Sequence, residues 1–206
     1  MKNGNKITTK QLTILGLMVA IMIIFSFTPI GSIPIGPLSI SLQVIPMAIC
    51  AITLGPKGGG IGGAIFGFLS FLQCFGIGVT SGMGVILVGI NPFLAFIQRF
   101  VPRLLDGFLV GCIFKAVRKK NTYLACAVAG FFSAFLNTLF FMTALVLLFG
   151  NTDYMQGLIG GRNIIVFICT FVGINAVFEM ISSTIITGML GSGLFKARVI
   201  PREDEL

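Results

Sequence analysis

The chain has 206 residues, of which 56% are hydrophobic and 10% are charged, and its net charge is +8. A soluble domain carries about 25% charged residues, so this composition excludes a soluble fold with an ordinary polar surface. The basic residues lie at the ends of apolar segments and not among exposed aromatic residues, which indicates contact with a lipid bilayer and excludes nucleic-acid binding. We therefore predict a single integral membrane domain over residues 1–206.

Six apolar segments follow one another along the chain, and a membrane helix needs about 20 such residues. The first segment follows the N-terminal lysines and resembles a signal peptide, but no small-residue cleavage site comes after it. The second is short and contains Pro46, as expected of a crossing that is surrounded by other helices. We predict membrane helices at residues 11–29, 42–54, 59–75, 92–117, 123–149 and 163–195.

The positions of the charges predict the orientation of these helices. Three connecting segments, 31–41, 76–91 and 150–162, contain only Asp153 and Arg162 as charged residues. Because basic segments stay on the cytoplasmic side of a bilayer, we predict an all-α bundle of six transmembrane helices with both termini in the cytoplasm. Eleven of the 14 basic residues lie in four places that alternate with these segments: Lys2, Lys6 and Lys10; Lys57; Lys115, Arg118, Lys119 and Lys120; and Lys196, Arg198 and Arg202.

Small residues recur at a spacing of four in two of the predicted helices. Four glycines, Gly55, Gly59, Gly63 and Gly67, line one face of the third helix and its entry, and a bare glycine face lets the backbone of a neighbouring helix approach closely. Gly16 and Ala20 form a similar pair on the first helix. Packing within the chain explains most such faces. Docking onto a separate membrane protein is the alternative, for which the first helix is the better candidate.

Charged and amide side chains also lie within the predicted helices, where they are costly. Arg99, Arg103 and Asp106 follow spacings of four and three, so they share one face of the fourth helix and leave one positive charge unbalanced. Two interpretations are open: a structural network of arginines and carboxylates, or a polar pocket open to the outside in which an arginine binds an anionic group. The other members of the predicted substrate-binding set are Gln43, Asn91, Asn137, Asn175 and Glu179.

Catalytic groups are scarce in this sequence. It contains no histidine, which is the commonest general base, and no serine or threonine lies in a nucleophile motif. Its acidic residues are too few for a metal-dependent lipid enzyme, and no G-x-x-x-x-G-K-[ST] sequence is present. We predict that the chain is not an enzyme, holds no metal or cofactor, and does not itself hydrolyse ATP.

The order of prolines and glycines carries a resemblance to a known family. Ile33-Pro34-Ile35-Gly36-Pro37-Leu38-Ser39-Ile40 is followed by Pro46 and then by Leu54-Gly55-Pro56-Lys57-Gly58. With six predicted helices, this order resembles the substrate-binding S components of energy-coupling factor (ECF) vitamin transporters. The resemblance implies a vitamin substrate, partnership with a transmembrane coupling subunit and two ATPase subunits, and a place in the plasma membrane of a bacterium. It also implies that Gly16 and Ala20 dock onto the coupling subunit.

Three segments look most like pantothenate-type members of this family: Phe100-Val101-Pro102-Arg103-Leu104, Asn137-Thr138 and Gly173-Ile174-Asn175-Ala176-Val177-Phe178-Glu179. The outer loops are also similar to biotin-type members. Biotin, riboflavin and folate are therefore alternative substrates. Other classes are a stand-alone proton-coupled transporter, with Asp106 or Glu179 as the proton site, and a structural membrane scaffold.

Pantothenate fits the polar residues because it offers one carboxylate to an arginine and hydroxyl and amide groups to asparagines. On this interpretation the two arginines of the fourth helix hold the carboxylate, and Asn137 and Asn175 bind the other polar groups. The carboxylates of Asp106 and Glu179 orient the arginines. Residues 33–41 border the pocket, and residues 76–91 act as a lid.

Overall fold

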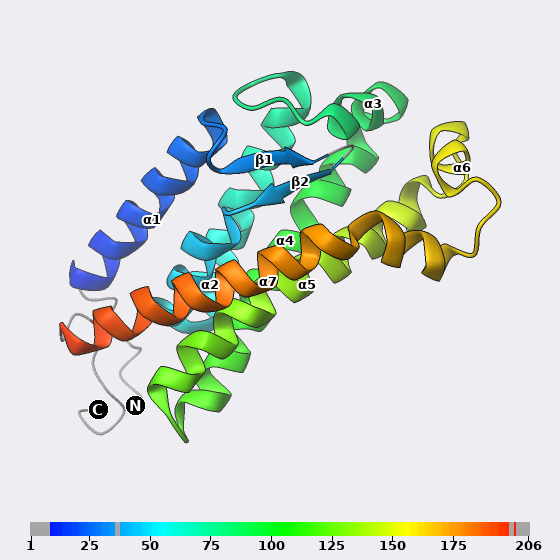
Figure 1. Ribbon diagram of the computed structural model, residues 1–206. Coiled ribbons are helices and arrows are strands. Elements are labelled where there is room, and N and C mark those ends of the chain that lie inside the picture. Colours follow the sequence, from blue (N-terminus) through cyan, green and yellow to red (C-terminus); the bar gives the residue numbers. More distant parts are fainter. Residues whose placement is uncertain (1–8, 36–37, 198–199, 201–206) are drawn as a thin grey trace, which may run out of the picture.

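The computed structural model describes residues 9–35, 38–197 and 200. Gly36 and Pro37 of the proline-rich motif lie outside the described residues, as do Lys2, Lys6, Arg198 and Arg202 of the basic clusters. The elements in chain order are α1 (Thr9–Phe27), β1 (Ser32–Ile35), β2 (Leu38–Ser41), α2 (Val44–Leu72), the 3₁₀ turn η1 (Gln73–Phe75), α3 (Gly82–Ile90), α4 (Pro92–Arg118), α5 (Thr122–Phe149), α6 (Asp153–Ile159) and α7 (Ile164–Lys196) (Figure 1).

Helix α2 is a helical hairpin, not a straight rod. Gly55 has φ 66° and ψ −152°, a conformation open to glycine but strained for other residues, and Pro56 then begins the second arm. A Cβ placed on Gly62 would lie 3.1 Å from Cβ of Cys50, although residues twelve apart in a straight helix are separated by about 18 Å. The predicted helices 42–54 and 59–75 are therefore two antiparallel arms that meet without the expected loop.

The ends of the two arms meet at Ser26 of α1. The hydroxyl of Ser26 donates to Oε1 of Gln43 over 3.3 Å, and Nε2 of Gln73 donates to the Ser26 carbonyl over 3.2 Å. These buried hydrogen bonds join the beginning and the end of the hairpin to the end of α1, so the three segments share one end of the molecule.

The second arm of α2 packs against α4 through glycines. A Cβ on Gly59 would lie 1.9 Å from the carbonyl oxygen of Gly107, and one on Gly63 would lie 2.1 Å from that of Arg103. The two backbones are thus in direct contact, as the four-residue glycine spacing predicts. This contact fixes α4, which carries both buried arginines, against the hairpin.

Several helices are long and apolar enough to cross a membrane. Within the described residues these stretches are Thr9–Phe27, Val44–Phe75, Thr122–Phe149 and Asn175–Lys196. Helix α4 has 27 residues but is less apolar than these stretches, because charged side chains lie along it. Large apolar side chains are exposed on the outside of the bundle, among them Leu17 on α1, Leu147 on α5 and Met189 on α7, as expected of surfaces that face lipid.

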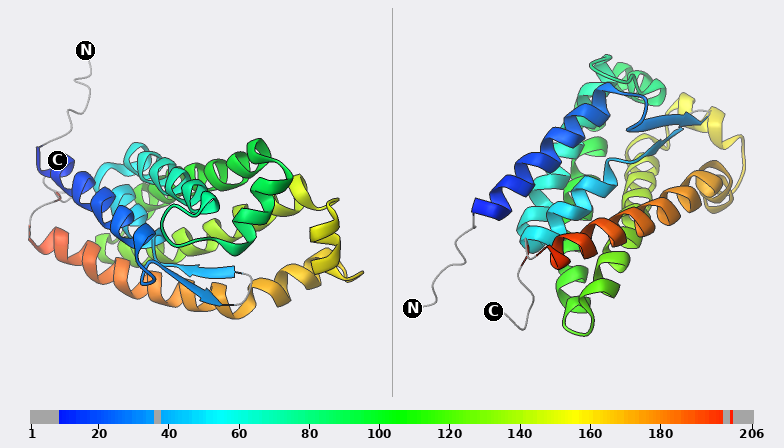
Figure 2. Two further views of the ribbon diagram at one scale, coloured as in Figure 1. Left: turned by 90° about the horizontal axis from the view of Figure 1, so that it is seen from above. Right: turned by 60° about the vertical axis from the view of Figure 1, so that its left-hand side comes forward.

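The three connecting segments with few charged residues contain short structural elements. Strands β1 and β2, within the segment 31–41, pair antiparallel as a β-hairpin in which Ile33 lies opposite Ile40, and β2 contacts α7 (Figure 2). The all-α prediction did not include this hairpin. Helix α3 lies in the segment 76–91 and α6 in the segment 150–162. All three elements lie at the end of the molecule opposite the α2 turn (Figure 1).

A candidate ligand-binding cavity

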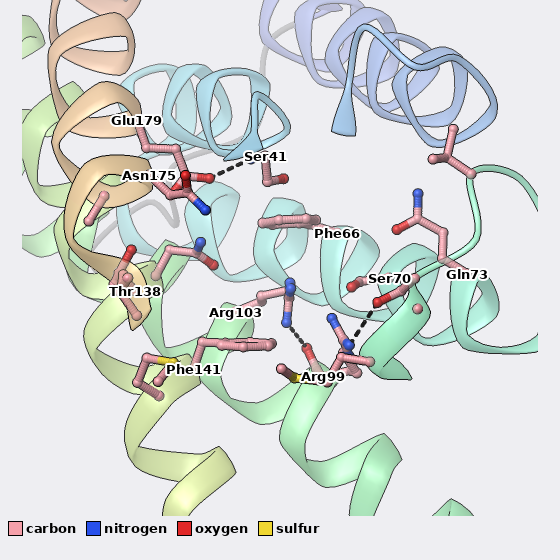
Figure 3. Close-up of a pocket in the computed structure, with 18 of the residues that line it drawn as sticks. Ser41, Phe66, Ser70, Gln73, Arg99, Arg103, Thr138, Phe141, Asn175 and Glu179 are labelled. Carbon is pink, nitrogen blue, oxygen red and sulfur yellow. Dashed lines mark hydrogen bonds between the residues drawn. The ribbon is translucent and has the colours of Figure 1, made fainter. Parts of the chain in front are cut away.

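A cavity of about 410 Å³ lies between α2, α4, α5 and α7 (Figure 3). The segment that leads into α3 borders it, as do Ser41 at the end of β2 and Tyr154 of α6. The three short elements at this end of the molecule therefore contribute to the cavity wall, while the long helices supply its floor and sides.

Two arginine side chains of α4 reach this cavity. Arg99 is 6% exposed and Arg103 is 5% exposed, and both line the cavity wall. Nη2 of Arg99 donates to the Ser81 hydroxyl over 3.0 Å, and Nη1 of Arg103 donates to the Arg99 carbonyl over 3.0 Å. Within the described part of the chain, Nε of each arginine has no hydrogen-bond partner. A buried charged donor without a partner is costly, so the cavity favours an anionic ligand.

Aromatic rings hold the two guanidinium groups in place. Cζ of Arg103 lies 4.6 Å from the ring centre of Phe66 and 5.3 Å from that of Phe141, and Cζ of Arg99 lies 5.1 Å from Phe141. Cation–π contacts of this kind are worth about 2 kcal/mol or more when desolvated. The rings therefore pack against both guanidinium groups and favour one direction for each side chain.

The other side of the cavity is formed by α7 and α5. The backbone N–H of Ser41 donates to Oε1 of Glu179, which joins the β-hairpin to α7. Asn175 lies one turn before Glu179, and both line the cavity together with Asn137 and Thr138 of α5. In Figure 3, Glu179 and Ser41 lie on one side and Arg99 on the other, with Phe66 and Arg103 between them. The cavity thus has a cationic side and a side rich in amide and carboxylate oxygens.

Three members of the predicted substrate-binding set lie outside the cavity wall. Gln43 accepts the hydrogen bond from Ser26. Asn91 caps α4, where Oδ1 accepts from the backbone N–H groups of Phe93 and Leu94. Asp106 is fully buried deeper in the bundle.

Asp106 does not hold Arg103 by a hydrogen bond, because within the described residues neither carboxylate oxygen of Asp106 has a partner. Side chains on a helix tilt toward its N-terminus. The guanidinium of Arg103 accordingly points back toward Arg99 and the two rings, away from Asp106 in the following turn.

Several residues of the cavity wall were not predicted from the sequence. Phe66 and Phe141 resemble lipid-facing residues, although Phe141 follows Asn137 by four positions and therefore shares its helix face. Ser81 is the N-cap of α3. Tyr154 of α6 is a further wall residue, and its partial burial raises the pKa of its phenol. The phenol therefore remains a hydrogen-bond donor at neutral pH.

An apolar exterior around a cavity lined by two buried arginines is typical of a membrane protein that binds a small solute. Residues 10–191 match the family described as "ECF transporter, substrate-specific component", and the chain belongs to this family. The predicted family is confirmed.

Two curated relatives align with almost the whole chain. The "Pantothenate transporter PanT" of Leuconostoc mesenteroides subsp. mesenteroides is 30% identical over 197 residues, which cover 90% of this chain and 92% of the relative. The "Pantothenic acid transporter PanT" of Lactococcus lactis subsp. cremoris is 26% identical over 208 residues, which cover 94% and 97% respectively.

Proposed function

We propose that this chain is the S component that captures pantothenate from outside the cell for an ECF importer. The observation that carries the proposal is the pair of buried guanidinium groups in the cavity wall, opposite Glu179 and Asn175. Pantothenate matches this arrangement, because its carboxylate suits the arginine side and its hydroxyl and amide groups suit the opposite side. The names of the two relatives support the same substrate.

For the membrane topology, we propose six crossings: α1, the two arms of α2, α4, α5 and α7. The α2 turn, the α4–α5 connection and the end of α7 lie at one end of the molecule (Figure 1). This end carries the exposed residues Lys57, Lys119, Lys120 and Lys196. By the positive-inside rule this end is cytoplasmic, and the cavity then lies toward the outside.

In this proposal a transmembrane coupling subunit and two ATPase subunits complete the importer, and α1 supplies the docking face. Gly16 and Ala20 are exposed and one turn apart, so they share a face of α1 that no described part of the chain covers. A flat face of small residues allows close helix contact in lipid.

Substitution Gly16→Leu is expected to separate ligand binding from assembly. Within the described part of the chain, no other element comes within 4 Å of a Cβ placed on Gly16, so the isolated subunit should fold and bind ligand as the unchanged protein does. Co-purification with the coupling subunit and ATP-dependent uptake into vesicles should both fall. Unchanged assembly would place the docking face elsewhere.

Ligand-dependent thermal stabilisation of the purified subunit tests the substrate. At a pantothenate concentration one hundred times Kd, binding should stabilise the folded state by about 2.7 kcal/mol, and riboflavin should give little stabilisation. Stabilisation by biotin or folate, with none by pantothenate, would assign a different vitamin to this chain without changing its family. Uptake by vesicles that contain this chain without any ATPase would instead support a stand-alone transporter.

A further inference from the structure

The N-terminus of α3 opens onto the cavity. Helix α3 has nine residues, and Ser81 is its N-cap. Ser81 and the first two helical residues, Gly82 and Met83, all line the cavity. The N-terminus of a helix carries a partial positive charge and backbone N–H groups that have no partner within the helix.

The hydrogen bonds of this first turn show which donors are left. The N–H of Ser81 donates to the Gln73 carbonyl, that of Gly84 to the Ser81 hydroxyl, and that of Val85 to the Ser81 carbonyl. Among the described residues, no group accepts a hydrogen bond from the N–H groups of Gly82 and Met83, so these two donors remain. Both belong to residues of the cavity wall.

Arg99 is packed against the same turn. Its Nη2 donates to the Ser81 hydroxyl over 3.0 Å, and a Cβ on Gly84 would lie 3.0 Å from this same nitrogen. Its Nε, within a side chain that is 6% exposed, has no hydrogen-bond partner in the described part of the chain. A buried cation with an unused donor and a helix N-terminus with two unused donors therefore lie side by side.

We propose that the ligand carboxylate binds between Arg99 and the backbone N–H groups of Gly82 and Met83. This inference rests on the proposed function and deepens it, because it orients the ligand within the cavity. The carboxylate lies at the α3 end, and the hydroxylated end points toward Glu179 and Asn175. Helix N-termini bind carboxylates and phosphates through backbone donors and the helix dipole, so the site selects an acid over the corresponding alcohol.

Two substitutions at one position test this carboxylate site. Gly82→Pro removes one donor without breaking the helix, because proline is favoured at the first helical position. The preceding Ser81 has φ −87° and ψ 106°, which is the extended conformation that a following proline requires. Gly82→Ala is the matched comparison: it keeps the N–H, and its Cβ would meet no other described part of the chain within 4 Å.

Isothermal titration calorimetry with pantothenate and with its alcohol analogue, pantothenol, gives the readout. Gly82→Ala keeps the backbone donor, so it should keep the unchanged protein's ratio of affinities for the acid and the alcohol, whatever the added methyl group does to the affinity for pantothenate. Gly82→Pro should bind pantothenate about tenfold more weakly than the unchanged protein does, because a hydrogen bond to a charged group is lost. Binding of the alcohol should change little, so the preference for the acid should fall.

Equal ratios of acid to alcohol affinity in the two variants would overturn the carboxylate site while the proposed function stands. An equal loss for acid and alcohol would also overturn it, since the effect would then be steric. If the unchanged protein binds no pantothenate, the proposed function fails, and this inference fails with it.

Discussion

Substitution of Arg103 by alanine is expected to weaken pantothenate binding between about tenfold and a hundredfold, as is substitution of Arg99. The loss of a hydrogen bond to a charged group costs about 1.5–3 kcal/mol, and both guanidinium groups are buried in the cavity wall. Lysine should not restore binding at either position, because an ammonium group cannot reproduce the planar fork of a guanidinium. Calorimetric Kd values for the single variants give the measurement.

Two comparisons separate lost binding from lost folding. Arg162→Ala removes an exposed arginine from the connection between α6 and α7 and should leave Kd unchanged. The thermal midpoint of each ligand-free arginine variant, measured beside that of the unchanged protein, shows whether the variant is folded under the conditions of the binding experiment. Normal binding by both Arg99→Ala and Arg103→Ala would show that the arginines do not hold the carboxylate.

The long helices follow closely from the apolar segments of the sequence. The predicted ranges 92–117 and 123–149 correspond to α4 and α5. Asn91 and Asn121 cap these helices through their side chains, so the boundaries coincide with residues that end an apolar run. Hydrophobicity and capping act over a few residues, and a single sequence is enough to reveal them.

The short elements depend on contacts that a sequence pattern does not contain. Helices α3 and α6 have nine and seven residues, too few for a helical hydrophobic period. The β-hairpin is joined to α7 through Glu179, which is 138 residues from Ser41. Such a contact depends on how the long helices are arranged in space, which the local sequence does not specify.

The cavity was predictable where spacing along a helix places polar groups together. Arg99 and Arg103, and likewise Asn175 and Glu179, lie four residues apart and line the same cavity. The position of Asp106 was harder to predict. Asp106 lies on the expected face of α4, but it is buried deeper in the bundle, and the Arg103 side chain tilts away from it. Polarity alone also cannot distinguish a cavity residue from a helix cap such as Asn91.

The backbone contact between α2 and α4 provides the prediction with the largest expected effect on stability. Gly63→Ala should lower the free energy of unfolding by about 1–3 kcal/mol, the usual cost of overpacking. The new Cβ would lie 2.1 Å from the Arg103 carbonyl oxygen, so α4 must move away from the second arm of α2. Because Arg103 and Arg99 lie on α4, this shift should also weaken pantothenate binding.

Gly60→Ala provides a control on the same arm of α2. Its Cβ would approach no atom more closely than Cβ of Phe108 at 4.0 Å, and alanine has the higher helix propensity, so its stability should be maintained or slightly raised. Thermal unfolding of both variants with and without pantothenate compares the two positions. If Gly63→Ala matches Gly60→Ala in stability and in Kd, the two backbones are not in contact at this point. The geometry of the cavity would then not depend on the glycine face of α2.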